Sequence, residues 1–160
     1  MAAQNRPNQC LFSVPTDEPL ASCVVGNILS ESSPMVANFI LVAIGGALGA
    51  MARFALALAT TKFFGDEFPW GTLLANGLGC LAMGFLLGFG IQKQYASAYL
   101  LFGVGVLGAL TTYSTFSGET LTMCVDQRWG AAFGNVVANI LVSLGGCAIG
   151  FAISRMFIGS

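Results

Sequence analysis

The side chains of this sequence that are able to do chemistry are almost all neutral. Five serines and threonines fall within positions 111–117 of one apolar stretch, and three glycines precede them at 103, 105 and 108. The chain contains no histidine, so the usual proton shuttle at neutral pH and the commonest metal ligand are missing. No two carboxylates face each other in the apolar stretches, so the side chains that acid–base or metal catalysis needs are missing there. We therefore expect no enzyme, and chemistry done by hydroxyls, amides, aromatic rings and backbone.

The composition indicates which elements position these groups. The chain has 160 residues, of which 56% are hydrophobic and 8% are charged, whereas soluble domains carry about 25% charged residues. The net charge of −1 gives no electrostatic case for nucleic-acid binding. Four apolar stretches meet the length needed to cross a bilayer, and their continuity excludes a barrel. We predict an all-α membrane protein with four transmembrane helices per subunit, at about 36–60, 70–91, 97–125 and 131–157.

The first 34 residues differ in composition from the rest. They hold four of the five prolines, several serines and the acidic residues Asp17, Glu18 and Glu31. This composition is typical of a disordered lead-in. Met35 opens the first predicted helix, so a mis-assigned start is the alternative. In either case residues 35–160 form the predicted transmembrane domain.

The charges of the loops bear on orientation in the membrane. With four helices both termini share one side, which would hold Lys93 and Arg155, while the other side holds Lys62 and Arg128. Lysine and arginine in short loops normally set orientation, and here they are balanced. Short loops with few charges explain this balance, and so does a chain that inserts both ways round and pairs as an antiparallel dimer. Four helices are few for enclosing a pathway, which favours an oligomer.

Glycine and hydroxyl patterns predict how the helices pack and where one of them breaks. Pairs of glycines four apart, such as Gly45/Gly49, Gly84/Gly88 and Gly146/Gly150, allow helix backbones to approach closely. The glycines and hydroxyls around 108–112 disfavour a continuous helix. A break there would expose carbonyls that can hold a cation and a helix N-terminus that favours an anion.

Other polar side chains lie in the apolar stretches, where burial in lipid is costly. Arg53 lies inside the first, where it either anchors the helix near an interface or pairs with backbone carbonyls. In the second, Thr72 and Asn76 share a helix face, and Asn76 either lines a path or joins helices. Glu119 lies near the end of the third. In the fourth, three polar residues recur every four positions and form one stripe: Asn135, Asn139 and Ser143.

Three motifs resemble those of a known family. GGALGAMARF at 45–54, GTLLANGLG at 71–79 and GALTTYSTFSGE at 108–119 are similar to the signatures of the first, second and third helices of fluoride channels of the Fluc (CrcB) type. The similarity runs from about Met35 to the C-terminus. It implies antiparallel, dual-topology homodimers with two pores in the lipid bilayer. The implied function is passive fluoride export across the plasma membrane (the inner membrane in a Gram-negative cell), which protects the cell from fluoride toxicity.

The resemblance also implies roles for individual residues. It places these residues along the fluoride pores: Thr72, Asn76, Tyr113, Ser114, Thr115, Phe116, Asn139 and Ser143. The backbone carbonyls of Gly108 and Thr111 match the ligands of a structural sodium ion at the dimer interface. Arg53 and Glu119 match charged residues of the family's first and third helices. Tyr113 departs from the family, which usually has phenylalanine there, and its hydroxyl adds a donor and some bulk.

The alternative hypothesis is that the chain is a small dual-topology drug/proton antiporter. That class needs an acidic residue deep in the first helix, where this chain has only Arg53. A fluoride path agrees better with the residues, since neutral amide and hydroxyl donors can replace water around the ion without preventing its release.

Overall fold

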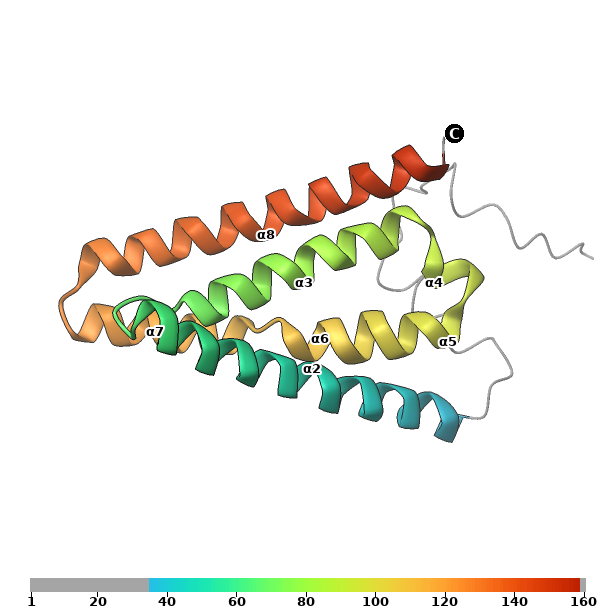
Figure 1. Ribbon diagram of the computed structural model, residues 1–160, viewed down its shortest axis with the longest axis horizontal. Helices are drawn as coiled ribbons and strands as arrows, with labels where there is room; N and C mark the ends of the chain where they lie inside the picture. The colour runs from blue at the N-terminus through green and yellow to red at the C-terminus, as the bar shows by residue number, and fades with distance from the viewer. Residues whose placement is uncertain (1–34, 159–160) are drawn as a thin grey trace, which may run out of the picture. The chain divides into compact units, whose positions relative to one another are not determined.

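The computed structural model describes residues 35–158, and all of its regular structure in that range is helical (Figure 1). These residues lie in one compact unit. In chain order the elements are α2 (Met35–Phe64), α3 (Trp70–Gly88), α4 (Ile91–Gln94), α5 (Ala96–Ala98), η1 (Tyr99–Leu107), α6 (Gly108–Leu110), α7 (Tyr113–Val125) and α8 (Trp129–Ile158). The predictions made for residues 1–34 fall outside the described residues.

The prediction of four helices able to cross a membrane is confirmed. The four spans are Met35–Phe64, Trp70–Gly88, Ala96–Val125 and Trp129–Ile158. The predicted end of the second helix at residue 91 is wrong, because Gly90 has a φ of 66° and turns the chain out of α3. The first helix runs to Phe64 rather than residue 60 and stops before Gly65, whose φ is 76°.

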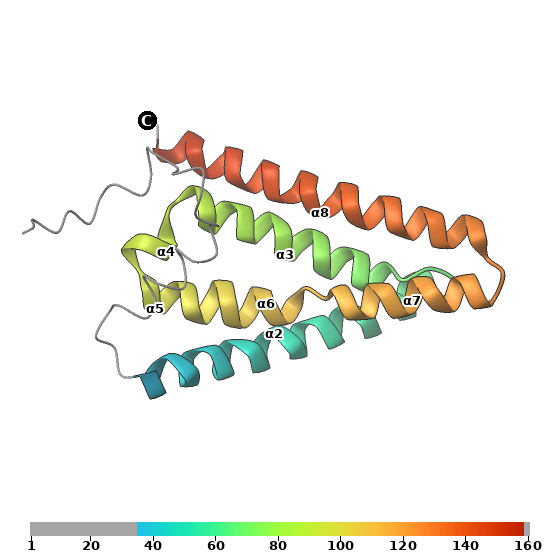
Figure 2. The ribbon, with the colours of Figure 1, turned by 180° about the vertical axis from the view of Figure 1, so that it is seen from behind.

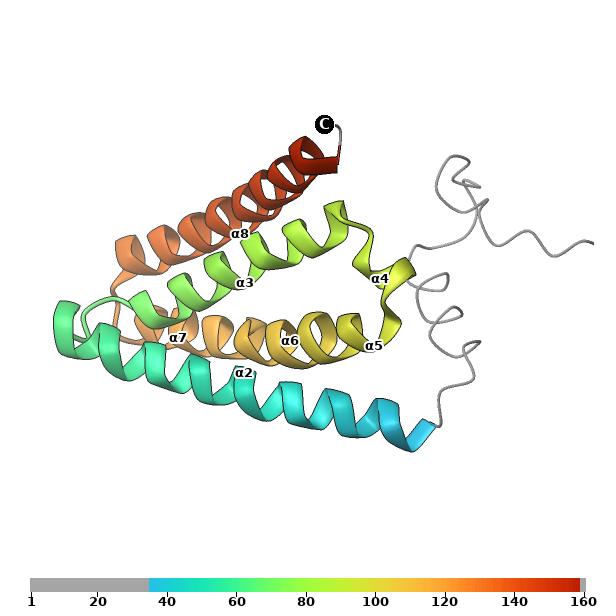
Figure 3. The same cartoon turned by 45° about the vertical axis from the view of Figure 1, so that its right-hand side comes forward.

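Two pairings dominate the packing of the spans, while α2 also contacts α3 and α7 contacts α8. The helices α3 and α8 lie side by side along most of their length, and α2 runs beside η1 and α6 (Figures 1 and 2). Figure 3 shows the same pairing after a 45° turn. Only 11% of the most apolar windows of α2 and of α8 is buried, so most of their apolar surface is available to lipid or to another chain.

Glycines allow the backbones of neighbouring helices to approach closely, as the glycine spacing predicted. A Cβ placed on Gly84 would lie 2.0 Å from the Cys147 carbonyl oxygen, and one on Gly150 would lie 2.0 Å from the Leu81 carbonyl oxygen. No side chain fits in such a gap, so the α3 and α8 backbones meet only because these two residues are glycines.

The third span has the least regular backbone of the four. Its first half, η1, is π-helical, which the sequence pattern did not predict. Helical backbone then ends at Leu110, and Thr111 (ψ 151°) and Thr112 (ψ 118°) are extended before α7 begins at Tyr113. This two-residue interruption falls within the run of glycines and hydroxyls, and it positions the polar site described below.

We predict that Gly150→Ala lowers the free energy of unfolding by about 1–3 kcal/mol, because the new methyl group overpacks the α3–α8 contact. Gly145→Ala on the same helix is the matched control, since nothing lies within 4 Å of its Cβ position. Thermal unfolding in detergent, followed by circular dichroism, measures both. Equal midpoints for the two variants would contradict the close contact.

Candidate functional site

The amide of Asn76 closes the interruption in the third span. Its Oδ1 accepts a hydrogen bond from the Thr112 N–H at 2.8 Å, and its Nδ2 donates to the Thr112 carbonyl at 3.3 Å. Both residues are buried, with exposed fractions of 9% and 6%. Extended backbone inside an apolar region is costly unless its polar groups are bonded. Asn76 therefore supplies, from α3, the bonds that the third span cannot make for itself.

A chain of hydrogen bonds leads away from Asn76 and returns to the third span. Asn76 Nδ2 also donates to Asn139 Oδ1 at 3.0 Å, and Asn139 Nδ2 donates to Asn135 Oδ1 at 2.9 Å. Asn135 Nδ2 then donates to Thr120 Oγ1 at 2.8 Å, and the Thr120 hydroxyl donates to the Phe116 carbonyl at 2.7 Å. Every amide donates in the same direction, so each orients the next. We call the residues Asn76, Asn139, Asn135 and Thr120 the amide chain.

Thr112 also starts the helix that follows the interruption. Its Oγ1 accepts the Thr115 N–H at 3.2 Å, which makes Thr112 the N-cap of α7. The same oxygen lies 3.2 Å from the Ser114 hydroxyl and 3.0 Å from the Thr115 hydroxyl. A cluster of three hydroxyls therefore surrounds the N-terminus of a 13-residue helix, where the backbone dipoles favour negative charge.

The interruption also takes donors away from two backbone carbonyls. In a continuous helix the Thr112 N–H would bond the Gly108 carbonyl, and the Thr115 N–H would bond the Thr111 carbonyl. Here the first donates to Asn76 and the second to the Thr112 hydroxyl. The carbonyls of Gly108 and Thr111 thus lose their helical partners, and carbonyl oxygens of this kind suit a hard cation such as sodium.

The two aromatic side chains of this region differ in burial. The ring centroids of Tyr113 and Phe116 are 5.6 Å apart, with the planes tilted by 55°. Phe116 is buried, with 9% of its surface exposed, whereas Tyr113 is 80% exposed. The Phe116 ring therefore lies inside the single chain, and the Tyr113 ring lies exposed on its surface.

A cavity of about 430 Å³, lined by both polar and apolar residues, lies where the α2–α3 and α7–α8 loops meet. At its inner end the Thr72 hydroxyl donates to Glu119 Oε1 at 2.8 Å. The second oxygen of Glu119, Oε2, is buried and has no hydrogen-bond partner among the described residues. Since Thr72 lies one helical turn before Asn76 on α3, the cavity reaches to within a turn of the interruption.

Comparison with known proteins assigns the family. Residues 40–151 match the family described as "CrcB-like protein, Camphor Resistance (CrcB)". The chain belongs to this family. A relative from Dehalococcoides mccartyi strain BAV1, named "Fluoride-specific ion channel FluC", is 43% identical over 109 residues, which are 67% of this chain and 84% of the relative. A relative of the same name from Shewanella sp. strain ANA-3 is 46% identical over 109 residues, or 67% of this chain and 87% of the relative. With four membrane-length helices, this member of the CrcB family is a multi-pass plasma membrane protein.

The structure brings most of the expected residues of this CrcB protein to two places. Asn76, Asn139 and the residues 113–116 gather at the interruption, and Thr72 meets Glu119 at the cavity. Arg53 and Ser143 are half-buried, and their side chains make no hydrogen bond within the part of the chain that the structure describes.

Three residues of the hydrogen-bonded region are absent from the site expected from the sequence. Thr112, Thr120 and Asn135 all belong to the hydrogen-bonded region, and Asn135 is wholly buried. The spacing of Asn135 four residues before Asn139 was a usable signal for one of them. Thr112 belonged to the run of hydroxyls that predicted the break, but its partner lies 36 residues away in the sequence. Thr120 carried no signal, because its partner lies 15 residues away.

We predict that Asn135→Leu lowers the free energy of unfolding by about 1–3 kcal/mol, because it leaves a buried Asn139 N–H without its side-chain acceptor. Ser117→Ala is the control, since that exposed hydroxyl bonds only the Tyr113 carbonyl. Its effect should stay within about 0.5 kcal/mol. Thermal unfolding in detergent measures both variants. If Ser117→Ala lowered the free energy of unfolding as much as Asn135→Leu, the amide chain would contribute no more to stability than an exposed hydroxyl.

Proposed function

We propose that this CrcB protein forms a fluoride-specific channel through which fluoride leaves the cell down its gradient. The observation that carries the proposal is the closure of the interrupted third span by Asn76, with hydroxyls and amides gathered around it. Membership of the family and the names of the relatives from Dehalococcoides and Shewanella support it. Export of this kind would protect the cell from fluoride.

The physical chemistry of fluoride suits such a lining. The ion is small and strongly hydrated, so it leaves water only for good hydrogen-bond donors. Neutral donors such as the Asn76 amide and the Ser114 and Thr115 hydroxyls replace water without binding too tightly for release. Aromatic ring edges carry partial positive charge, which gives Phe116 a role as a wall of the path. Asn139 and Ser143 extend the polar lining along α8.

Asn76 has no spare donor in this structure, because its Nδ2 bonds both Thr112 and Asn139. The bond to the Thr112 carbonyl is the longer, at 3.3 Å against 3.0 Å. In the proposed mechanism a passing fluoride takes the place of this carbonyl at the amide. The amide chain keeps Asn76 in the same orientation meanwhile, so the site reforms once the ion has moved on.

The channel we propose is an antiparallel homodimer with two pores. A single chain leaves Tyr113 80% exposed and most of the apolar surface of α2 and α8 uncovered. A second copy would cover Tyr113 and add its ring to the pore wall. The balanced loop charges agree with insertion in both orientations.

A structural sodium ion at the centre of this dimer is part of the proposal. The carbonyls of Gly108 and Thr111, freed from helical bonding, fit such an ion, and two copies would supply four oxygen ligands. A sodium ion bound there would supply a fixed positive charge close to an anion path. The residues of this chain would hold it through the backbone oxygens of Gly108 and Thr111, without an acidic side chain.

The charged residues of the spans are assigned supporting roles. Arg53 would anchor α2 at the membrane interface through its long side chain. Glu119, bonded to Thr72, lies at the inner end of the cavity. The drug/proton antiporter is not favoured, since α2 holds no carboxylate at all.

We predict that Asn76→Asp lowers fluoride efflux from proteoliposomes at least about tenfold, equivalent to about 1.4 kcal/mol in the barrier. An ionised carboxylate donates no hydrogen bond and repels fluoride. A fluoride electrode follows the efflux, and size-exclusion chromatography checks the assembly. Ser117→Ala should conduct like the wild type. Unchanged efflux through Asn76→Asp would remove this amide from the path, and a wild type without fluoride efflux would overturn the function.

A further inference from the structure

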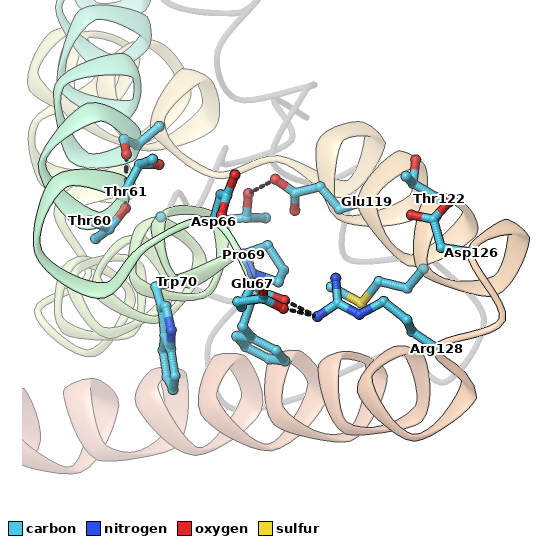
Figure 4. A pocket seen from close by; sticks show the side chains of 15 residues that line it. Thr60, Thr61, Asp66, Glu67, Pro69, Trp70, Glu119, Thr122, Asp126 and Arg128 are labelled. Atoms are coloured by element: carbon cyan, nitrogen blue, oxygen red, sulfur yellow. Dashed lines mark hydrogen bonds and ion pairs between the residues drawn. The ribbon is translucent and has the colours of Figure 1, made fainter.

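Most of the charged side chains that line the cavity between the two loops are carboxylates, although an anion is proposed to cross it. Asp66, Glu67, Asp126 and Glu119 all line it, and among its lining residues Arg128 is the only cation that the structure describes (Figure 4). Carboxylates repel fluoride and lower its local concentration. A single guanidinium at this place therefore has a large influence on whether an anion enters.

Arg128 is held at the mouth of the cavity rather than left to the solvent. Its Nη2 donates to Glu67 Oε2 at 3.1 Å and to the Glu67 backbone carbonyl. These bonds join the α7–α8 loop to the α2–α3 loop across the cavity, as Figure 4 shows. Of the pair, 40% of the Arg128 side chain and 87% of the Glu67 side chain is exposed. Glu67 is thus well solvated and offsets the guanidinium only in part.

The guanidinium also keeps donors for an anion. Arginine carries five N–H groups, and both bonds to Glu67 use the same nitrogen. The donors on Nη1 and Nε make no hydrogen bond within residues 35–158. Arg128 therefore offers a charge and directional donors on the route from the loops to the Thr72–Glu119 pair.

We propose that Arg128 attracts fluoride into this cavity and sets the rate at which the ion is admitted to the path. The inference rests on the proposed function. It adds to the proposed path a residue that lies outside the membrane-spanning helices and attracts the ion. Glu67 holds the guanidinium at the mouth, and Arg128 counters the surrounding carboxylates. The ion then passes inward toward Asn76.

A purely structural role makes a different prediction. An exposed ion pair between loops contributes little stability, and losing it would alter conduction by the same factor at every salt concentration. Electrostatic attraction instead weakens as salt rises, because the screening length falls from about 30 Å at 0.01 M to about 3 Å at 1 M. The salt dependence of efflux therefore separates the two roles.

The test compares Arg128→Gln, Arg128→Lys and Lys62→Gln in proteoliposomes at low fluoride, with 0.01 M or 1 M of an impermeant salt. Lys62 is the matched control, because it is an exposed cation at the end of α2 that does not line the cavity. At low salt we expect Arg128→Gln to reduce the initial efflux rate about three- to tenfold. At high salt the reduction should shrink to less than about twofold. Arg128→Lys should keep most of the rate. Lys62→Gln should lose less of the rate than Arg128→Gln at low salt, and it should match the wild type at high salt.

Three results would overturn the inference while leaving the channel function in place. They are a wild-type rate for Arg128→Gln at low salt, an equal loss at both salts, and a loss for Lys62→Gln as large as that for Arg128→Gln. A wild type that passes no fluoride at either salt would overturn both the channel function and the role of Arg128.

Discussion

The hydrogen bonds between Asn76 and the backbone of Thr112 are the interaction on which the rest of this structure depends. A helix that crosses an apolar layer has to bond all of its backbone groups, and the third span fails to do so at Thr111 and Thr112. The Asn76 amide bonds both backbone groups of Thr112 from the neighbouring helix. Asn139 and Asn135 then fix the orientation of that amide. The interruption is therefore supported by a specific polar contact.

The same interaction brings two opposite kinds of polar group close together. Because the Thr112 N–H donates to Asn76, the Gly108 carbonyl loses the donor that it would have in a continuous helix. Because the Thr112 hydroxyl caps α7, three hydroxyls lie beside a helix N-terminus, where the backbone dipoles favour negative charge. In the proposed channel these are the sodium site and the fluoride path. One asparagine thus links the stability of the fold to both.

Much of the fold followed from the sequence, because apolar length and glycine spacing are local signals. They predicted the four spans and the close contacts at residues such as Gly84. The end of α3 was misplaced, because only the positive φ of Gly90 stops the helix. The site was predicted less completely, since Asn76 bonds Thr112 across 36 residues of sequence. Periodicity within one helix carries no information about such a partner, nor about a loop residue such as Arg128.

In the proposed channel, the neutral donors around Asn76 make a path that selects fluoride. The most direct test loads proteoliposomes containing the wild-type protein with equal fluoride and chloride, and follows the efflux of both ions down the same gradient. We expect fluoride to leave, and we expect chloride efflux to stay at the level of protein-free liposomes. Chloride efflux as fast as fluoride efflux would contradict it.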